Sequence, residues 1–476
     1  MASETLDAEP RAVAGGTTIP VVDPSSGETF GQIHRGTAED IDAAVKTARR
    51  AFESSWERVP AFERGRVLMR LSGLVQEHFG ALWRLESRDT GKPAPQAESD
   101  IGACARYCEY YAGAADKLHG ETIPYAEGFT VMTLREPHGV TGHIIPWNYP
   151  AQIFGRSVVA ALAAGNACVV KPAEDACLSV LRLAELALEA GLPEGVLNVV
   201  TGYGSEAGAA LAGHEGIDHI SFTGSPAVGT LVQQAAAIHN RPVTMELGGK
   251  SPQLVFADAD LENALPSLVN AAIQNAGQTC SAGSRLLVER SAYDTVMERL
   301  GEAFGRLKVG AAAGEPDCGP LISARQRGRV LAFLERARAD GLEVVAQGSL
   351  ADAPAGGFYV RPTLIGKVPP EHPLAREEVF GPVLAAAPFE DEDEAVALAN
   401  GTDYGLVAGV WTKDGGRQLR LARRLRAGQV YVNNYGAGGG IELPFGGVKR
   451  SGFGREKGFE GLKSFTIVKT VTFKHG

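Results

Sequence analysis

The fold is decided by residues 139–191, which read GVTGHII (139–145), a helical pattern through SVVAALAAG (157–165), ACVVKP (167–172) and LSVLRLAELALEAG (178–191). The two short runs contain the β-branched residues that strands favour, and each precedes a longer helical pattern. The second helical pattern ends at Gly191, with Pro193 just beyond it, which is a typical helix stop. This order predicts parallel strands joined by crossover helices.

The same alternation continues along the next part of the chain. The stretches that follow are VLNVV (196–200), SEAGAALAG (205–213), HISFTG (219–224), PAVGTLVQQAAAIH (226–239), TMELGG (244–249) and PQLVFAD (252–258). Repeated strand–helix–strand units of this kind predict a parallel sheet that is covered by helices on both faces. We assign them to a first lobe.

A second α/β series starts near residue 261. Its stretches are LENALPSLVNAAIQNAG (261–277), RLLVER (285–290), SAYDTVMERLGEAFGRL (291–307), QRGRVLAFLERARADG (326–341), PVLAAAPF (382–389), YGLVAGVWT (404–412) and QVYVNN (429–434). The predicted fold class is therefore α/β, with two doubly wound, Rossmann-like lobes. A cleft between two such lobes is the expected ligand site.

Two strand-like segments fit neither lobe. FTVMTLREP (129–137) and SFTIVKTVTF (464–473) alternate or cluster β-branched residues. We expect them to form a small sheet that protrudes and pairs between subunits, because the second one needs a partner for its edge. The alternative is an edge strand on the same subunit.

Length and charge narrow the class of protein. The chain has 476 residues, beyond the ~250–300 at which one hydrophobic core stops growing. The net charge is −10, so the basic run RLARRLR (420–426) is read as one face of a helix with Leu421 and Leu425 inward. No nucleic-acid partner is expected from an acidic chain without stacking aromatics. The N-terminus reads as a polar lead-in without the features of a secretory signal, and no apolar stretch approaches ~20 residues, so we expect a cytoplasmic protein without a membrane partner.

The cysteines point to a reducing compartment rather than to a disulfide scaffold. Six occur in the chain: Cys104, Cys108, Cys168, Cys177, Cys280 and Cys318. Cys104 and Cys108 are one helical turn apart, but no histidine lies at ligand spacing, so we predict buried thiols and no metal site. Cys168 and Cys177 are expected to be structural.

Two glycine-containing turns are candidates for phosphate binding. GYGSEA (202–207) satisfies G-x-G-x-x-G/A between a strand and a helix, but no acidic residue follows about 20 residues later. We interpret it as a surface turn that opens a helix. In FTGSPAVG (222–229), Gly224 ends a strand, Ser225 suits a helix N-cap and Gly229 lets backbones approach, so free N–H groups would face a pyrophosphate. A plain strand-to-helix turn fits these residues equally well.

Eight motifs occur together in one order. They are IPWNYP (145–150), VVKPAE (169–174), FTGSPAVG (222–229), MELGGKSP (245–252), GQTCSAGSRLLV (277–288), EEVFGPV (377–383), VNN (432–434) and PFGGVKRSGFGRE (444–456). In this order the chain closely resembles the aldehyde dehydrogenase superfamily from about Asp23 to the C-terminus.

The resemblance implies an NAD(P)-dependent, non-acylating enzyme with three parts. They are a nucleotide-binding domain (1–119 and 138–248), a catalytic domain (249–456) and an oligomerisation arm (120–137 and 457–476). It also implies a homodimer or a homotetramer.

Three residues match the family's catalytic groups. Cys280 matches the nucleophile whose thiolate attacks the aldehyde carbon. Asn148 matches the side chain that, with the Cys280 backbone N–H, stabilises the resulting oxyanion. Glu246 matches the general base that activates water, and its presence favours hydrolysis over transfer to coenzyme A. Without the motifs, Cys280 would be interpreted as a thiol in the core and Asn148 as a turn residue. Glu246 would be interpreted as a solvated residue at a strand end.

The cofactor residues also follow from the resemblance. Lys171 and Glu174 match contacts to the adenosine ribose, and the carboxylate of Glu174 favours NAD over NADP because it would repel a 2′-phosphate. Trp147 and Ser225 match the adenosine and pyrophosphate side. Glu378 and Phe380 match contacts to the nicotinamide ribose. Glu456 is a candidate for proton relay, but the lysine that many relatives place nine residues after the oxyanion asparagine is here Ser157.

The substrate side departs from common patterns of the family. Eight positions after Asn148 stands Arg156, as in succinate-semialdehyde dehydrogenases, where an arginine grips a carboxylate. The alternative is that Arg156 pairs with a protein carboxylate such as Glu442. Apolar walls are expected from Tyr149, Phe445 and Trp411, with Thr279 and Ser281 beside the nucleophile and a glycine-rich stretch GAGGGIE (436–442) at the entrance. The substrate is left open between a carboxylate-bearing semialdehyde and an aromatic aldehyde.

Two other functions compete with this interpretation. A scaffolding descendant of the fold is expected to have lost the nucleophile or the base, and both are present here. A thiol hydrolase that uses Cys280 needs a histidine, which no recognisable motif supplies.

Overall fold

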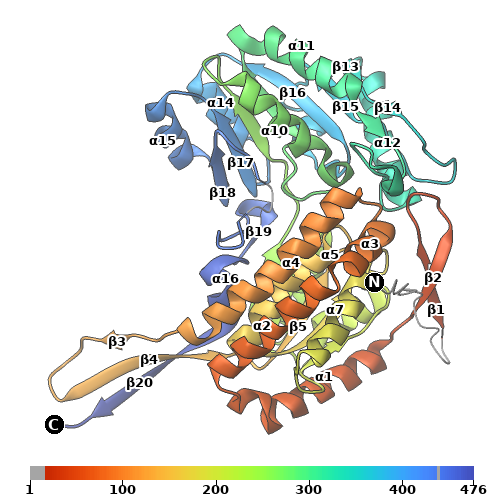
Figure 1. Cartoon of the computed structure of the whole chain (residues 1–476). Coiled ribbons are helices and arrows are strands. Elements are labelled where there is room, and N and C mark those ends of the chain that lie inside the picture. Colours follow the sequence, from red (N-terminus) through yellow and green to blue (C-terminus); the bar gives the residue numbers. More distant parts are fainter. Residues whose placement is uncertain (1–16, 437–439) are drawn as a thin grey trace.

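The computed structural model describes residues 17–436 and 440–476. The chain forms two α/β lobes, one above the other in Figure 1, and a narrow arm that projects from the lower lobe. The predicted polar lead-in lies outside the described residues.

The first lobe is built on a six-stranded sheet. In spatial order its strands are β19 (Gly452–Phe453), β9 (Val243–Glu246), β8 (His219–Thr223), β5 (Val140–Ile145), β6 (Ala167–Pro172) and β7 (Leu197–Val199). The pairs from β9 to β7 are parallel, as the strand–helix alternation predicts, and β19 is antiparallel to β9. The strand order reverses between β5 and β8, which makes that position the switch point of a doubly wound sheet.

Helices cover both faces of this sheet. The segment that precedes β5 supplies α1 (Ala38–Ser54), α2 (Ala61–Glu77), α3 (Phe79–Thr90) and α4 (Ala94–Ala114). The crossover connections supply α5 (Pro150–Ile153), the π-helix η3 (Phe154–Val159), α6 (Ala160–Ala164), α7 (Leu178–Glu189), the π-helix η4 (Gly204–Gly208), α8 (Ala209–Gly213) and α9 (Pro226–Ala237). Their apolar faces are buried because they cover the strands, as Leu183 and Leu186 of α7 illustrate.

The second lobe contains a seven-stranded sheet. Its spatial order is β13 (Glu343–Gln347), β15 (Thr363–Gly366), β16 (Val383–Phe389), β11 (Arg285–Glu289), β10 (Pro252–Val255), β17 (Val407–Trp411) and β18 (Gln429–Val432). All neighbours are parallel except β13 and β15. The surrounding helices are α10 (Leu261–Ile273), α11 (Arg290–Arg306), α12 (Ala324–Ala339), α13 (Pro373–Arg376), α14 (Glu392–Asn400) and α15 (Gly415–Arg424).

Shorter elements complete the chain. They are β1 (Thr18–Val22), β2 (Thr29–His34), η1 (Trp56–Arg58), η2 (Ala115–Lys117), η5 (Gln274–Gly277), β12 (Lys308–Val309), η6 (Ala312–Gly314), β14 (Ser349–Leu350) and η7 (Lys449–Ser451). The basic run at 420–426 lies at the end of α15, where Leu421 and Leu425 are buried as predicted.

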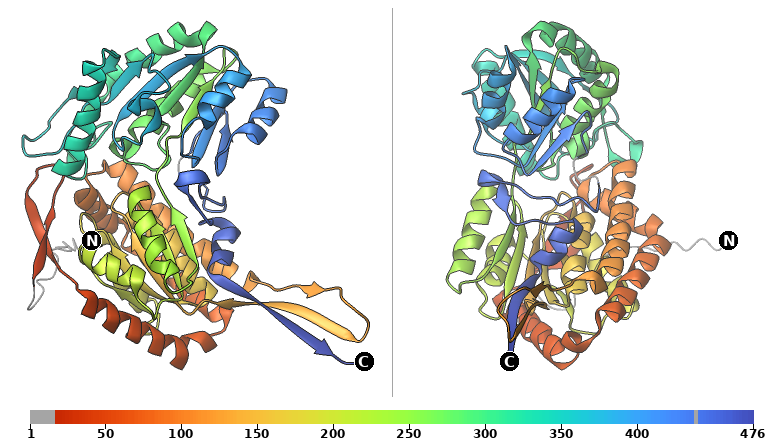
Figure 2. Two further views of the ribbon diagram at one scale, coloured as in Figure 1. Left: turned by 180° about the vertical axis from the view of Figure 1, so that it is seen from behind. Right: turned by 90° about the vertical axis from the view of Figure 1, so that its left-hand side faces the viewer.

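The arm is a three-stranded sheet, and the predicted pairing of its two long segments is confirmed. β20 (Thr466–Lys474) is antiparallel to β4 (Phe129–Pro137), and β3 (Thr122–Ile123) pairs with the other edge of β4. Figure 2 shows this sheet projecting away from both lobes.

Two predicted domain boundaries near the C-terminus are wrong in detail. Gly452 and Phe453, which we placed in the catalytic domain, extend the first sheet through β9. The helix α16 (Gly458–Ser464), which we placed in the arm, belongs to the first lobe because Leu462 and Phe465 are buried in its core. The chain returns to the first lobe before it enters the arm at Thr466.

Five of the six cysteines, all of which lie in the described residues, are buried. Cys104 and Cys108 are on the inner face of α4, as predicted for core thiols. In the ranges 17–436 and 440–476, no helix combines the length and the apolar character that a bilayer span requires.

Candidate active site

The ends of three parallel strands of the first lobe carry predicted site residues. β5 is followed by Trp147 and Asn148, and β8 is followed by Gly224 and Ser225. β9 ends at Glu246 itself. Carboxyl ends of parallel strands share one edge of the sheet, and β5 and β8 flank the switch point, so these residues gather where doubly wound folds bind ligands.

The second lobe contributes the connections that precede its strands. Cys280 lies before β11, and Glu378 and Phe380 lie before β16. Gly249, just before β10, permits a close approach of two of these connections: a Cβ there would come 2.5 Å from the carbonyl oxygen of Cys280. The Glu246–Gly249 stretch thus joins the end of the first sheet to the nucleophile.

Cys280 is the one cysteine that is partly exposed. It packs against an apolar cluster of Leu406, Val407 and Phe445. Burial raises the pKa of its thiol to about 11, whereas the positive charge of Arg156 lowers it. The thiol is therefore protonated near neutral pH before substrate binds, and Arg156 is the cation that favours its thiolate.

Asn148 contacts the loop that carries the nucleophile. Its Nδ2 donates a hydrogen bond to the carbonyl oxygen of Gln278 at 3.0 Å, and the side chain is buried. In return, Nδ2 of Asn275 donates to the carbonyl oxygen of Asn148 at 3.0 Å. These two bonds join the end of β5 to the chain just before Cys280.

Glu246 is fully buried, and neither of its carboxylate oxygens has a hydrogen-bond partner among the described residues. Burial, followed by the negative charge of Glu456, raises the pKa of Glu246 well above its usual range. Gly446 lies against the carboxylate, since a Cβ at that position would come 2.7 Å from Oε1 of Glu246. A buried glutamate with a raised pKa is suited to exchange a proton near neutral pH.

Arg156 pairs with a protein carboxylate, although not with the one named from the sequence. It lies on η3, and its Nε forms an ion pair with Oε2 of Glu456. Its Nη2 donates to Oγ1 of Thr223 at 3.1 Å, and its guanidinium lies 5.1 Å from the centre of the Phe445 ring. Glu442 pairs instead with Arg106, at 2.7 Å between Oε1 and Nη2.

Glu456 also ends a buried row of hydrogen bonds that the sequence did not predict. Oγ of Ser221 donates to its Oε1 at 2.8 Å, and Oγ of Ser157 donates to Oγ of Ser221 at 3.0 Å. Nδ1 of His143 lies 2.6 Å from Oγ of Ser157. Burial lowers the pKa of His143 to about 3, so its ring is neutral. Ser157 is thus a neutral member of this row. Alternation along β5 and β8, which turns His143 and Ser221 to one face, is the signal that could have found it.

Lys171 and Glu174 lie together at the end of β6. Nζ of Lys171 donates to Oε2 of Glu174 at 2.8 Å. The backbone N–H of Gly204 approaches Oε1 of Glu174 at 3.5 Å. The GYGSEA turn opens a helix at Gly204, as predicted, but it also lies beside the candidate ribose carboxylate. Its acidic neighbour comes from the adjacent strand rather than from the following sequence, and we therefore overlooked it.

The FTGSPAVG turn caps α9. Oγ of Ser225 accepts a hydrogen bond from the N–H of Val228 at 3.4 Å. A Cβ at Gly229 would come 2.6 Å from Cδ2 of Leu247, so glycine lets the helix approach the stretch that follows Glu246. The first turns of α9 consequently lie close to Leu247, the residue after Glu246.

Trp147 and Phe380 meet from different lobes, with ring centres 5.4 Å apart and planes at 83°. Close to them, Oε1 of Glu378 accepts a hydrogen bond from the N–H of Gly249 at 3.0 Å. Gly248 leaves room for this carboxylate, because a Cβ there would collide with it. Burial raises the pKa of Glu378 to about 7.

Not all of the residues predicted on the substrate side lie near Cys280. The Tyr149 hydroxyl lies 2.7 Å from Oγ1 of Thr279, and Phe445 lies in the apolar cluster beside Cys280. Ser281 is buried, and its carbonyl accepts a hydrogen bond from the Tyr435 hydroxyl. The expected wall role of Trp411 is wrong: its indole is buried in the core of the second lobe and donates to Oε1 of Gln253 at 2.9 Å. The glycine-rich entrance lies partly outside the described residues.

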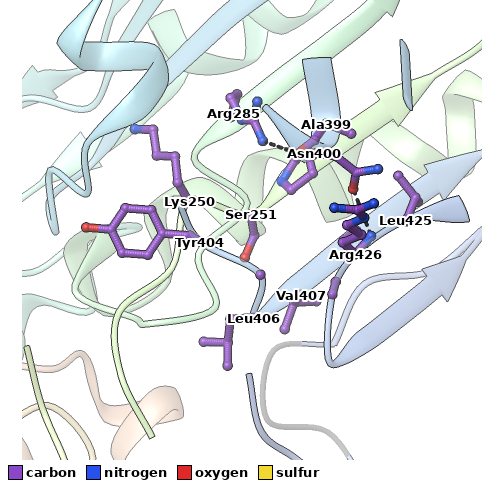
Figure 3. A pocket seen from close by; sticks show the side chains of 14 residues that line it. Lys250, Ser251, Arg285, Ala399, Asn400, Tyr404, Leu406, Val407, Leu425 and Arg426 are labelled. Atoms are coloured by element: carbon purple, nitrogen blue, oxygen red, sulfur yellow. Dashed lines mark hydrogen bonds between the residues drawn. The ribbon is translucent and has the colours of Figure 1, made fainter. Parts of the chain in front are cut away.

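A separate pocket in the second lobe is lined by Lys250, Ser251, Arg285, Asn400 and Tyr404, among others (Figure 3). No predicted site residue lines it. Arg285 already donates to the carbonyl oxygens of Leu398 and Ala399, at 2.6 and 2.7 Å. These bonds satisfy the end of α14, so the arginine has a structural role there.

The chain was compared with known proteins. The model of the aldehyde dehydrogenase family matches residues 12–471. Human retinal dehydrogenase 2 is 42% identical over 464 residues, which cover 96% of this chain and 89% of the human protein. An aldehyde dehydrogenase of Emericella nidulans is 41% identical over 463 residues, covering 97% of this chain and 93% of the relative.

Solved structures are also similar to this chain. A crystal structure of a Burkholderia cenocepacia protein is 68% identical, with a TM-score of 0.96 and 97% of each chain covered. The NAD+ complex of an aldehyde dehydrogenase from Bacillus cereus is 41% identical, with a TM-score of 0.94, and covers 97% of this chain and 94% of that one. The chain therefore belongs to the aldehyde dehydrogenase family.

Proposed function

We propose that this chain oxidises an aldehyde to a carboxylic acid with NAD and water, and that Cys280 is the nucleophile. The observation that carries the proposal is the bond from Nδ2 of Asn148 to Gln278, which brings an oxyanion donor from the first lobe to the loop of Cys280. Glu246 adds a buried base from the end of β9, in the same sheet.

The residues present fit a dinucleotide. Ser225 caps the N-terminus of α9, where the N–H groups of the first turn can face a pyrophosphate. The carboxylates of Glu174 and Glu378 can accept hydrogen bonds from ribose hydroxyls. We assign Lys171 and Glu174 to the adenosine ribose. Trp147, Gly224 and Ser225 are assigned to the adenosine and pyrophosphate side, and Glu378 and Phe380 to the nicotinamide ribose. The ionised carboxylate of Glu174 favours NAD over NADP by repelling a 2′-phosphate. NAD, when bound, supplies the acceptor for the hydride of the substrate.

The protein groups act around that transfer. The Cys280 thiol releases its proton to solvent water and its sulfur bonds to the aldehyde carbon. The electron pair of the carbonyl π bond moves to the oxygen, which becomes an oxyanion. Nδ2 of Asn148 and the backbone N–H of Cys280 donate to this oxygen. Loss of hydride from the same carbon leaves a thioester on Cys280. Glu246 then takes a proton from a water molecule, whose oxygen attacks the thioester carbon and releases the acid and the thiol.

The state of Arg156 supports a neutral substrate. Its charge is compensated by Glu456, its Nη2 is bonded to Thr223, and its guanidinium packs against Phe445. A substrate carboxylate would have to compete with this buried ion pair. Of the two substrate classes, we therefore favour the aromatic aldehyde, with Phe445 and Tyr149 as apolar contacts.

We also infer that the chain is a cytoplasmic homodimer or homotetramer. Exposed apolar side chains on the arm support self-association, because a protruding sheet with such edges pairs readily. They are Ile123, Leu134, Ile467, Val468 and Phe473. The molar mass of the full chain by light scattering tests this inference, and a monomer at micromolar concentration would refute it.

The proposed activity is tested by following NADH formation without coenzyme A. The aldehydes are an aromatic one, a short aliphatic one and a carboxylate-bearing semialdehyde, with NAD or NADP at equal concentration. We expect reduction of NAD in preference to NADP, and faster turnover at low concentrations of the aromatic aldehyde. A protein that reduces neither cofactor with any aldehyde would refute the proposal.

A further inference from the structure

The loop before Cys280, residues 274–280, has an unfavourable backbone. Asn275 (φ 51°, ψ 41°) and Ala276 (φ 52°, ψ 36°) are both left-handed, and Gly277 follows at φ 71°. Residues with a Cβ rarely adopt this conformation, and two in succession persist only where the surroundings impose it. We call residues 274–280 the nucleophile loop and ask which groups hold it.

The first support comes from the start of α4. Oε1 of Gln96 accepts a hydrogen bond from the backbone N–H of Asn275 at 2.8 Å. This bond is made at the first left-handed residue of the nucleophile loop. It joins the first lobe to the second, and Figure 1 shows one end of α4 reaching the second lobe.

The second support starts at Lys92, two residues before α4. Nζ of Lys92 lies 4.2 Å from the centre of the Tyr149 ring. The Tyr149 hydroxyl lies 2.7 Å from Oγ1 of Thr279, which itself donates to the carbonyl oxygen of Gln274 at 3.3 Å. Because the Thr279 hydrogen is used in that bond, Tyr149 is the donor to Thr279. Thr279 is the residue before Cys280.

Lys92 is itself fixed by two buried carboxylates. Its Nζ lies 3.5 Å from Oε1 of Glu86 and is also paired with Oδ2 of Asp100. The three side chains are at most 3% exposed. Nε2 of Gln152 donates to the other oxygen of Asp100 at 2.6 Å. A cation held this way cannot move toward solvent, and its attraction to the face of the Tyr149 ring is strong because the site is dry.

We propose that the segment 92–96 is a positioning element for Cys280, with Lys92 acting through Tyr149 and Thr279 and Gln96 acting through Asn275. Both supports end in the nucleophile loop, on opposite sides of Gly277. Neither Lys92 nor Gln96 is placed among the reacting groups, so both act by holding the sulfur in place. This inference rests on the proposed role of Cys280 as the nucleophile.

The test compares Gln96→Ala with Gln96→Glu, which keeps an acceptor for the Asn275 N–H, in the full-length enzyme. The matched control is Glu98→Ala, an exposed position two residues along the same helix. Two rates are measured: the NADH burst of the first turnover, and the alkylation of Cys280 by iodoacetamide, with the site identified by peptide mass.

For Gln96→Ala we expect both rates to fall by roughly 10- to 100-fold, since small misplacements of a reacting group have effects of this size. The KM for NAD should stay within about twofold of that of the unmodified protein, and Gln96→Glu should restore both rates. A folded Gln96→Ala protein with unchanged burst and alkylation would overturn the role of Gln96.

Lys92→Met tests the second support by the same two rates, with Tyr149→Phe as the partner variant that keeps the charges intact. Tyr149→Phe loses only the bond to Thr279, so it should also slow alkylation. Normal alkylation in Tyr149→Phe would overturn this path even if Lys92→Met does not fold. Cys280→Ala distinguishes a failure of the proposed function from a failure of the positioning role. If Cys280→Ala keeps its dehydrogenase activity, the proposed function is wrong. If Cys280→Ala is inactive but the Gln96 and Tyr149 variants behave like the unmodified protein, only the positioning role is rejected.

Discussion

Arg156 and Glu456 form a buried ion pair, with side chains that are 10% and 0% exposed. Arg156 follows the PWNYP motif in sequence, and Glu456 closes GFGRE some three hundred residues later. The pair lies where the field of Arg156 lowers, and that of Glu456 raises, the pKa of Glu246. The pKa of the candidate base Glu246 therefore depends on one residue that follows the PWNYP motif and on one that closes GFGRE.

Breaking this pair should destabilise the fold. In Glu456→Gln the guanidinium of Arg156 loses its buried counter-charge, which typically costs about 3–5 kcal/mol in the free energy of unfolding. The measurement is denaturant unfolding at a fixed protein concentration. The exposed pair Arg299–Glu262 provides the control, and Glu262→Gln should leave the free energy of unfolding nearly unchanged because water screens this pair.

A charge-free version of the pair should recover most of that loss. Buried ion pairs are often replaced by apolar residues without net cost, so Arg156→Met combined with Glu456→Met should be more stable than Glu456→Gln alone. A Glu456→Gln protein as stable as the parent would show that the pair is not desolvated as described.

Removing the charge of Arg156 should make Cys280 less reactive. The pKa of the thiol is about 11, and the charge of Arg156 is the largest of the effects that lower it. In Arg156→Met this pKa should rise further, and alkylation at a fixed pH near 8 should slow by up to about tenfold for each unit of pKa. Arg156→Lys keeps a positive charge, so its rate of alkylation should lie between those of the parent protein and Arg156→Met.

The same variant distinguishes the two substrate classes. If Arg156 serves the protein through Glu456, Arg156→Met should change the KM of neutral and carboxylate-bearing aldehydes to a similar extent. A selective rise in KM for the carboxylate-bearing substrate would restore the carboxylate-binding role that the sequence suggested.

Binding of NAD should improve as the pH rises through about 7. Burial raises the pKa of Glu378 to about 7, so the side chain is a neutral acid below that pH and a carboxylate above it. Only the carboxylate accepts two hydrogen bonds from ribose hydroxyls. The KM for NAD should therefore fall between about pH 6 and pH 8, and Glu378→Gln should abolish this dependence. A KM that is flat in the parent protein would reject the assignment of Glu378.

Replacing the candidate base should separate the two halves of the reaction. In Glu246→Gln the thioester on Cys280 still forms but its hydrolysis slows, by roughly 10²- to 10⁴-fold for loss of a general base. Stopped-flow traces should show a burst of NADH followed by a slow steady state. A variant with normal turnover would exclude Glu246 as the base.

Much of the fold and of the site could be predicted because both depend on local patterns. Strand–helix alternation determines a parallel sheet, and parallel strands carry their end residues to one edge. That is why Asn148, Ser225 and Glu246 lie at one edge of the sheet although nearly a hundred residues separate the first from the last. The arm was predictable because its β-branched segments fit no crossover unit.

The sequence predictions that were wrong or missing concern contacts between residues that are far apart in the chain. The sequence suggested Glu442 as a protein partner of Arg156. Only the packing shows that Glu442 pairs with Arg106 and that Glu456 pairs with Arg156. Trp411 turned out to be core because its strand is buried on both faces. The left-handed pair Asn275–Ala276 carries no glycine signal, since its conformation is imposed by neighbours such as Gln96.

Whether Cys280 carries the substrate through oxidation is measured by NADH formation in Cys280→Ala, with an aldehyde that the parent protein oxidises. We predict that NADH formation falls to the rate without enzyme, while the variant unfolds like the parent and still binds NAD. NADH formation by Cys280→Ala at a substantial fraction of the parent rate would contradict the claim.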